Sequence, residues 1–233
     1  MPAREPTPSK AKRKMKAASP LASASAPVAK PARRSRKSSA APVPAAATPA
    51  QPAPGRTRRT ILGEGKYLRL VSDDGWEYAE RRNVTGVVAI VARTPRGRLL
   101  LVEQFRPAIG GRVIELPAGL VGDTPEFAGE EMAQAVLREL REETGYEARK
   151  LTFLAHGASS AGLTPEIVTF YRATGLKKVA AGGGDGSESI IVHEVPLTGI
   201  RQWLLDRTAE GYTIDAKIYA GLYFVGTPQP LMV

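Results

Sequence analysis

Several residue types are scarce or missing in this chain of 233 residues. Cysteine is absent, which excludes a disulfide scaffold, a cysteine zinc site and a cysteine nucleophile. Only two histidines are present, so we expect no histidine-rich transition-metal site, whereas a hard cation held by carboxylates stays open. No apolar run reaches the length of a membrane span, so we expect a cytoplasmic protein that does not cross a membrane.

Aromatic residues and isoleucine are missing from residues 1–59, and the only acidic residue there is Glu5. Fourteen Lys/Arg give this segment a net charge of +13, and eleven prolines interrupt any helix. Its apolar content is almost all alanine, so the segment could bury too little area to offset chain entropy. We therefore predict a disordered basic tail at 1–59 and one folded domain at 60–233, whose net charge is −3.

Three roles for the predicted tail stay open. It could be a solubilising linker, or it could make nonspecific contact with nucleic acid or another polyanion through counterion release. Because it is rich in Arg and Ser and poor in acids, it could also be a cleaved transit peptide.

The order of apolar patterns in residues 60–233 predicts an α/β domain. Phe127–Thr144 has apolar residues three and four apart and is followed by Gly145, which predicts a central helix. Two further helices are expected at Leu197–Thr208 and Ile214–Val225, so we expect helices that cover a mixed sheet. The predicted strands are Tyr67–Val71, Trp76–Arg82, Val87–Val91, Arg98–Gln104, Val113–Leu116, Leu151–Ala155, Ile167–Ala173 and Ile190–Val195.

Three glutamates of the central helix, Glu139, Glu142 and Glu143, are spaced three and four apart, which puts them on one helix face. Clustered like charges repel, and two kinds of partner could relieve the repulsion. Arg138 and Arg141 would do so in a surface ion-pair helix. Alternatively, the three carboxylates would form an oxygen-rich site for Mg²⁺ or Mn²⁺.

The wider pattern resembles the Nudix box. Glu130 is followed after seven residues by Arg138-Glu139-Leu140, then by Glu142-Glu143 and Gly145-Tyr146 at intervals of one residue. Upstream, Glu115–Leu120 resembles the approach to that box in ADP-ribose pyrophosphatases, and the resemblance covers about residues 64–225. One departure is clear: ten residues separate Gly119 from Glu130, where the family has five, and the extra residues fall in Val121–Gly129.

The resemblance implies a Nudix α/β/α sandwich and a Mg²⁺-dependent hydrolase of nucleoside diphosphates linked to another group, with Mn²⁺ as the alternative cation. Carried over to this sequence, Glu139, Glu142 and Glu143 would hold the cations with the backbone carbonyl of Ala118. Arg138 would brace the loop–helix–loop, with Glu130 near the helix start.

The resemblance also suggests substrate-binding residues, each with a plainer alternative. Arg106 would grip the pyrophosphate, or it is a surface arginine. Trp76 would help to hold the adenine, or it packs in the core or an interface. Glu166 would face the pyrophosphate or the metal, or it is an exposed loop residue.

The general base is expected in the glycine-rich loop Gly182–Ser189, because family members take it from a mobile acidic loop before a late strand. Glu188 is the first choice and Asp185 the second, and Glu142 is a further catalytic candidate. Both His156 and His193 are expected to be hydrogen-bonded sheet residues rather than catalysts.

Together these features predict hydrolysis of ADP-ribose or a similar nucleotide sugar to AMP and a sugar phosphate. The resemblance further implies a homodimer with exchanged N-terminal strands. Other substrates stay open, namely a different nucleotide sugar, a dinucleoside polyphosphate or a capped RNA end. A nonenzymatic polyanion-binding protein with the Nudix fold is the alternative from another class.

Overall fold

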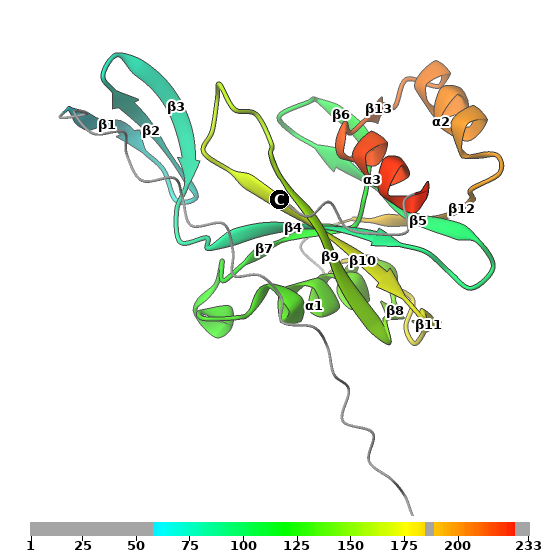
Figure 1. Cartoon of the computed structure of the whole chain (residues 1–233). Helices are drawn as coiled ribbons and strands as arrows, with labels where there is room; N and C mark the ends of the chain where they lie inside the picture. Colours follow the sequence, from blue (N-terminus) through cyan, green and yellow to red (C-terminus); the bar gives the residue numbers. More distant parts are fainter. Residues whose placement is uncertain (1–57, 185–188, 227–233) are drawn as a thin grey trace, which may run out of the picture. The chain divides into compact units, whose positions relative to one another are not determined.

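The structure is a computed structural model that describes residues 58–184 and 189–226 (Figure 1). The predicted tail lies outside this part except for its last two residues, so the tail stays a prediction. The first strand, β1, begins at Arg59, one residue before the predicted start of the domain. No helix of the described part is long and apolar enough to cross a membrane.

Two four-stranded sheets form the centre of the domain, with strand orders β7-β4-β10-β9 and β12-β5-β6-β13. The pairs β4–β10 and β6–β13 are parallel and the other neighbours are antiparallel, so both sheets are mixed, as predicted. Their strands are β4 (Gly86–Ala92), β5 (Arg98–Arg106), β6 (Gly111–Glu115), β7 (Ala118–Val121), β9 (Lys150–Ala158), β10 (Ile167–Thr174), β12 (Ile191–Pro196) and β13 (Thr213–Ile214).

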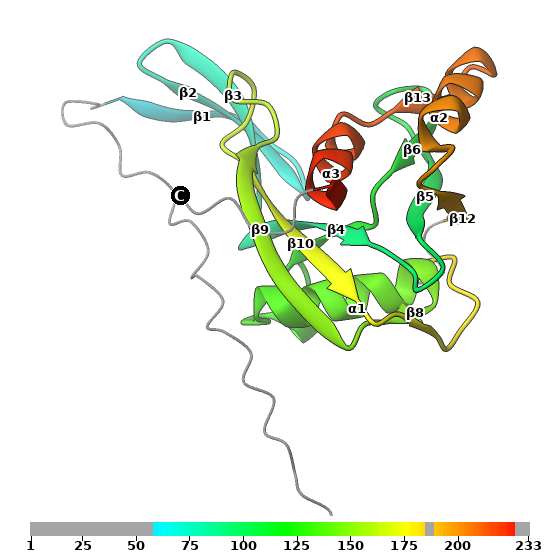
Figure 2. The ribbon, with the colours of Figure 1, turned by 45° about the vertical axis from the view of Figure 1, so that its right-hand side comes forward.

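Two smaller antiparallel sheets accompany them, one of order β1-β2-β3 and one that pairs β8 with β11. The backbone N–H of Ala79 in β3 donates to the carbonyl of Leu163 at 2.9 Å, which joins the N-terminal sheet to the loop between β9 and β10 (Figure 2). The strands of these sheets are β1 (Arg59–Glu64), β2 (Leu68–Asp73), β3 (Trp76–Arg81), β8 (Tyr146–Glu147) and β11 (Lys177–Lys178).

Strand β4 alternates its side chains between two hydrophobic cores. Val88 and Ile90 belong to the core that includes helix α1, whereas Ala89 and Val91 belong to the core that includes helices α2 and α3. A strand that is buried on both faces has a continuous apolar sequence, which is the pattern that predicted it. The helices therefore cover opposite sides of the sheets (Figure 1), and the predicted α/β/α sandwich is confirmed. They are α1 (Met132–Thr144), α2 (Ile200–Ala209) and α3 (Lys217–Gly226).

The start of the central helix was predicted too early. α1 begins at Met132, five residues after the predicted start at Phe127. Gly129 has a φ of +83°, which a continuous helix does not tolerate, and the residues before it form a 3-10 turn at Pro125–Phe127. The predicted end is correct, because Gly145 takes the left-handed conformation with a φ of +74°.

Strand β7 was not predicted, because Pro117 was taken as the end of the preceding strand. The chain instead leaves β6, passes through Pro117 and pairs again with β4. The carbonyl of Pro117 accepts a hydrogen bond from the N–H of Ile90 at 2.8 Å, which fixes this crossing. As a result, β7 leads the chain directly toward the N-terminus of α1.

Candidate active site

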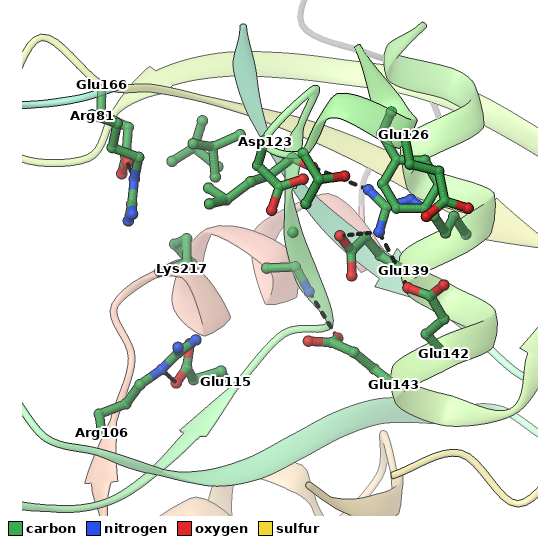
Figure 3. Close-up of a pocket in the computed structure, with 18 residues that line it drawn as sticks. Arg81, Arg106, Glu115, Asp123, Glu126, Glu139, Glu142, Glu143, Glu166 and Lys217 are labelled. Carbon is green, nitrogen blue, oxygen red and sulfur yellow. Dashed lines mark hydrogen bonds and ion pairs between the residues drawn. The ribbon is translucent and has the colours of Figure 1, made fainter. Parts of the chain in front are cut away.

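The three α1 glutamates lie along one side of a pocket between α1 and the two main sheets (Figure 3). The helical spacing predicted this common face. Glu143 is buried, and its Oε2 accepts a hydrogen bond from the backbone N–H of Ala118 at 3.1 Å. Glu142 is the most exposed of the three, since 36% of its side chain remains accessible.

Arg138 is the centre of a hydrogen-bonded network on this side. Its guanidinium donates twice to Glu130 at 3.1 Å, once to Glu139 at 2.7 Å and once to Glu142 at 3.1 Å. A further N–H donates to the carbonyl of Leu120 at 3.1 Å, which ties the network to β7. Burial alone would lower the pKa of Arg138, but the hydrogen bonds and charges of Glu130 and Glu139 outweigh it and raise this pKa. The arginine therefore stays charged at any pH at which the protein is folded.

Gly119 lets the helix approach β7 closely. A Cβ atom at this position would overlap the carboxyl group of Glu139. The carboxylate therefore lies directly against the backbone of the strand, and only glycine accommodates it there without a shift.

The opposite side of the pocket carries basic side chains (Figure 3). Arg106 makes a bidentate pair with Glu115, through Nε at 2.6 Å and Nη2 at 2.9 Å. Arg81 donates to Glu166 at 2.6 Å. Lys217, in the first turn of α3, pairs with Asp215. Each base thus has a carboxylate partner, and Arg81 and Arg106 stay more than 40% exposed.

The pocket has a volume of about 580 Å³, comparable to a site for a small organic ligand. Seven carboxylates and four basic side chains face it, which gives the lining a formal charge of −3. The lining residues are Arg81, Val87, Arg106, Glu115, Ala118, Gly119, Leu120, Asp123, Thr124, Glu126, Phe127, Arg138, Glu139, Glu142, Glu143, Glu166, Val168 and Lys217.

Comparison with known proteins agrees with this arrangement. The family described as "NUDIX domain" matches residues 83–206, which is more than half of the chain. The chain belongs to the Nudix family. The segment with the acidic helix and its approach, 115–146, lies inside the matched range, so the identification made from the Nudix box is confirmed.

Among its curated relatives is the methanol dehydrogenase activator of Bacillus methanolicus, 36% identical over 166 residues that cover 68% of this chain and 87% of the relative. An ADP-ribose pyrophosphatase of Bacillus subtilis is 41% identical over 93 residues, or 39% of this chain and 46% of that enzyme. A solved structure titled "Crystal structure of ADP compounds hydrolase" matches with a TM-score of 0.55 and 22% identity, covering 74% of this chain and 95% of that one. The prediction of a Nudix pyrophosphohydrolase that resembles ADP-ribose pyrophosphatases is confirmed.

Nudix hydrolases generally use divalent metal ions, and the donors in this pocket fit a hard cation. Carboxylate oxygens from α1 lie in a pocket whose negative charge exceeds its positive charge. In residues 58–184 and 189–226, however, no three Asp, Glu, His or Cys side chains form one ready metal-ligand group. Arg138 pairs with Glu139 and Glu142, and the N–H of Ala118 donates to Glu143. Arg141 pairs with Glu147 instead, so only the Arg138 part of the ion-pair alternative is found.

The structure brings most of the predicted site residues together. The pocket is lined by the α1 glutamates together with Arg106, Glu166 and Ala118. Trp76 does not, and it is 68% exposed at the end of the β2–β3 turn, so the alternative of packing in this chain's core is wrong. The two candidate bases, Asp185 and Glu188, lie outside the described residues.

Both histidines have sheet partners, as predicted. His156 Nδ1 lies 3.1 Å from Thr169 Oγ1. His193 Nε2 lies 2.8 Å from an oxygen of Glu103, which also pairs with Arg112. Burial alone would raise the pKa of Glu103, but the hydrogen bonds from His193 and Arg112 outweigh it and lower this pKa.

The sequence did not single out several pocket residues. Arg81 and Glu115 belong to segments in which other residues were proposed for the site. The alternation of side chains along a strand was the only feature that could indicate which face they are on. Lys217 was expected to have a structural role, because no sequence feature indicates that α3 lies near α1. Asp123 and Phe127 lie in the extra residues before the helix, which had only turn composition.

Proposed function

We propose that this Nudix protein hydrolyses the pyrophosphate bond of ADP-ribose or a similar nucleotide sugar, giving AMP and a sugar phosphate. One observation carries the proposal: the acidic face of α1 lies across a single pocket from Arg81, Arg106 and Lys217. Arginines on one side of the pocket can bind a diphosphate, whereas on the α1 side the carboxylates outnumber the single arginine, Arg138, so added cations are needed there. The similarity to the ADP-ribose pyrophosphatase of Bacillus subtilis supports the choice of substrate class.

Mg²⁺, with Mn²⁺ as the alternative, would be held by Glu139, Glu142 and Glu143 together with the backbone carbonyl of Ala118. When bound, such cations neutralise charge on the phosphate oxygens and lower the pKa of a bound water. The charge of the pocket supports this assignment, because a diphosphate would otherwise enter a lining with a formal charge of −3. In the proposal, Arg138 orients Glu139 and Glu142 toward the cations through its hydrogen bonds to both carboxylates.

On the opposite side, Arg106 would bind the pyrophosphate through the same fork that now holds Glu115. Arg81, which now donates to Glu166 through Nε, would also bind the pyrophosphate, and Glu166 would then be released toward the cations. Two arginines would orient the substrate, so that attack of water on one phosphorus atom is favoured over other geometries.

We further propose a homodimer that forms through the β1–β2–β3 sheet. This sheet and the turn between β1 and β2 expose six large apolar side chains, as interaction surfaces do. Trp76 lies outside the pocket of its own chain, so its proposed contact with adenine would be made at the pocket of the second copy. The exposed apolar residues are Ile61, Leu62, Tyr67, Leu68, Leu70 and Trp76.

The decisive experiment for the function is incubation of the purified protein with ADP-ribose and Mg²⁺, with AMP and ribose phosphate measured by chromatography. We expect both products in equal amounts, and we expect the reaction to stop when a chelator is added. A parallel panel with a dinucleoside polyphosphate and a capped RNA tests the alternative substrates. Turnover of the panel without turnover of ADP-ribose would refute the proposed substrate.

The general base is proposed to be Glu188. A base must come within hydrogen-bond reach of the attacking water, and in the sequence Glu188 is three residues before strand β12, which begins at Ile191, whereas Asp185 is six residues before it. We expect Glu188→Gln to lower turnover much more than Asp185→Asn. If Glu166→Gln proves the most damaging of the three, the base lies in the loop before β10 instead.

For the remainder of the chain we propose that residues 1–59 form a basic tail outside a catalytic domain at 60–233. Because Arg59 pairs with Glu80, a deletion that tests this division should stop at residue 57. We expect the shortened protein to keep its turnover of ADP-ribose and its melting temperature. If the full chain binds nucleic acid, that binding should weaken as the salt concentration is raised. The deletion should abolish it.

A further inference from the structure

The extra residues before the Nudix helix form an ordered turn rather than a loose loop. The N–H of Phe127 donates to the carbonyl of Thr124 at 3.1 Å, and the N–H of Glu130 donates to the carbonyl of Phe127 at 2.9 Å. These bonds close the 3-10 turn Pro125–Phe127 and connect it to the start of α1. They fix the backbone of Phe127 beside the pocket, which its side chain helps to line.

The ring of Phe127 covers the guanidinium group of Arg138. The Cζ atom of Arg138 lies 4.2 Å from the centre of the ring, well inside the range of a cation–π interaction. Only 15% of the Arg138 side chain is exposed, and cation–π contacts are strongest where the cation has lost its water.

The two kinds of contact on Arg138 use different parts of the same planar group. Its N–H groups donate to the carboxylates of Glu130, Glu139 and Glu142 and to one backbone carbonyl. An arginine presents these donors along its edges, which leaves its faces for an aromatic ring. The ring therefore restrains the guanidinium without competing for any of its donors.

We propose that Phe127 is a positioning residue for the cation ligands, acting through Arg138. This inference rests on the proposed function, because Glu139 and Glu142 are the cation ligands assigned there. Arg138 is their common anchor, and a guanidinium that is free to tilt would hold the two carboxylates in several arrangements. Loss of a partner in the outer shell of a metal site typically weakens metal affinity or activity by about 10- to 100-fold.

The test compares Phe127→Ala, Phe127→Leu and Phe127→Tyr in the full chain. Mn²⁺ binding is measured without nucleotide by electron paramagnetic resonance, and the melting temperature is measured without metal. We expect Phe127→Ala to weaken Mn²⁺ binding about tenfold, at the lower end of the range for an outer-shell partner. Phe127→Leu should resemble it, because leucine fills the space without an aromatic face. Phe127→Tyr should bind Mn²⁺ nearly as tightly as the wild type.

The same variants give a kinetic signature. Phe127→Ala should raise the Mg²⁺ concentration for half-maximal hydrolysis of ADP-ribose by about the same tenfold factor. The KM for ADP-ribose at saturating Mg²⁺ should not change, because Phe127 has no part in the basic side of the pocket. Tyr219→Ala is the matched control, since it removes an aromatic ring that is 57% exposed on α3 and does not line the pocket.

Three results would overturn the proposal. The first is a folded Phe127→Ala protein that binds Mn²⁺ as tightly as the wild type. The second is a Phe127→Leu protein that binds Mn²⁺ as tightly as Phe127→Tyr, because the aromatic ring would then not be needed. The third is an equal loss in Tyr219→Ala. A wild type that releases no AMP from ADP-ribose would refute the proposed function, while the Mn²⁺ series would still decide the role of Phe127.

Discussion

The two sides of the pocket use the same residue types in different proportions. On the α1 side, one arginine, Arg138, serves three carboxylates, and a fourth carboxylate, Glu143, accepts a backbone N–H. On the opposite side, Arg81 and Arg106 each have one carboxylate partner. The α1 side therefore carries an excess of negative charge, whereas these two ion pairs are balanced.

Because of this difference in charge, we expect the two sides of the pocket to bind different partners, cations on the α1 side and phosphate on the other. An excess of carboxylates draws in cations from solution, and the repulsion among them is the free energy that a bound cation relieves. The Arg81–Glu166 pair is partly exposed, so its arginine can exchange the carboxylate for a phosphate at small cost. The exchange costs more at Arg106, because its partner Glu115 is buried. The following changes test this division, from the largest expected effect to the smallest.

On the α1 side, Glu143→Gln keeps the shape of the side chain and removes one negative charge. We expect turnover of ADP-ribose to fall by at least about a hundredfold, the order found when one electrostatic element of an active site is removed. The melting temperature should change little, because glutamine can still accept the N–H of Ala118. A turnover within a few-fold of wild type would mean that the acidic side does not hold the catalytic cation.

On the opposite side, Arg106→Lys keeps the charge and removes the planar fork. We expect the KM for ADP-ribose to rise about tenfold with a much smaller change in kcat, because the lost contact is made in the ground state and in the transition state alike. Arg112→Lys is the control, since Arg112 pairs with Glu103 on the other face of the same two strands. If both variants raise KM equally, Arg106 is not a phosphate ligand.

Glu103→Gln tests the ion pair of the buried Glu103 with Arg112, which does not line the pocket. We expect the free energy of unfolding at pH 7 to fall by about 1 kcal/mol, with KM unchanged. The folded protein lowers the pKa of Glu103, so this stabilisation is complete above the unfolded pKa of about 4.3 and is lost as the pH falls through the folded value. Urea titrations of both proteins at pH 7 and pH 3 should show the gap closing in acid.

The smallest change is expected from Tyr171→Phe in the core that packs against α1. The Tyr171 hydroxyl is buried and has no hydrogen-bond partner among the described residues, and burial raises the pKa of this phenol. Its removal should leave the free energy of unfolding unchanged or raise it by less than about 1 kcal/mol. A clear fall in the melting temperature would indicate that the hydroxyl has a partner, such as an ordered water.

The sequence predicted those parts of the site whose geometry is local. Glu139, Glu142 and Glu143 share a face because helical spacing requires it, and the end of the helix follows from Gly145. The strands that are buried on both faces were found from their apolar runs.

Contacts between residues that are far apart in the sequence could not be predicted from local spacing and composition. Lys217 reaches the pocket only because α3 lies where the chain returns to β6 through β13. The 3-10 turn before α1 places Phe127 against Arg138, and neither turn composition nor spacing predicts that contact. The late start of α1 follows from Gly129, whose positive φ lies between the 3-10 turn and the helix.

The link between β3 and the loop before β10 has a thermodynamic consequence. Two contacts make this link, the Ala79–Leu163 hydrogen bond and the Arg81–Glu166 ion pair, and they connect the edge of the N-terminal sheet to one side of the pocket. If phosphate takes Arg81 from Glu166, occupancy of the pocket and association through the sheet become coupled equilibria. Each must then change the other by the same factor, so substrate would tighten or loosen the dimer as much as dimerisation changes substrate affinity.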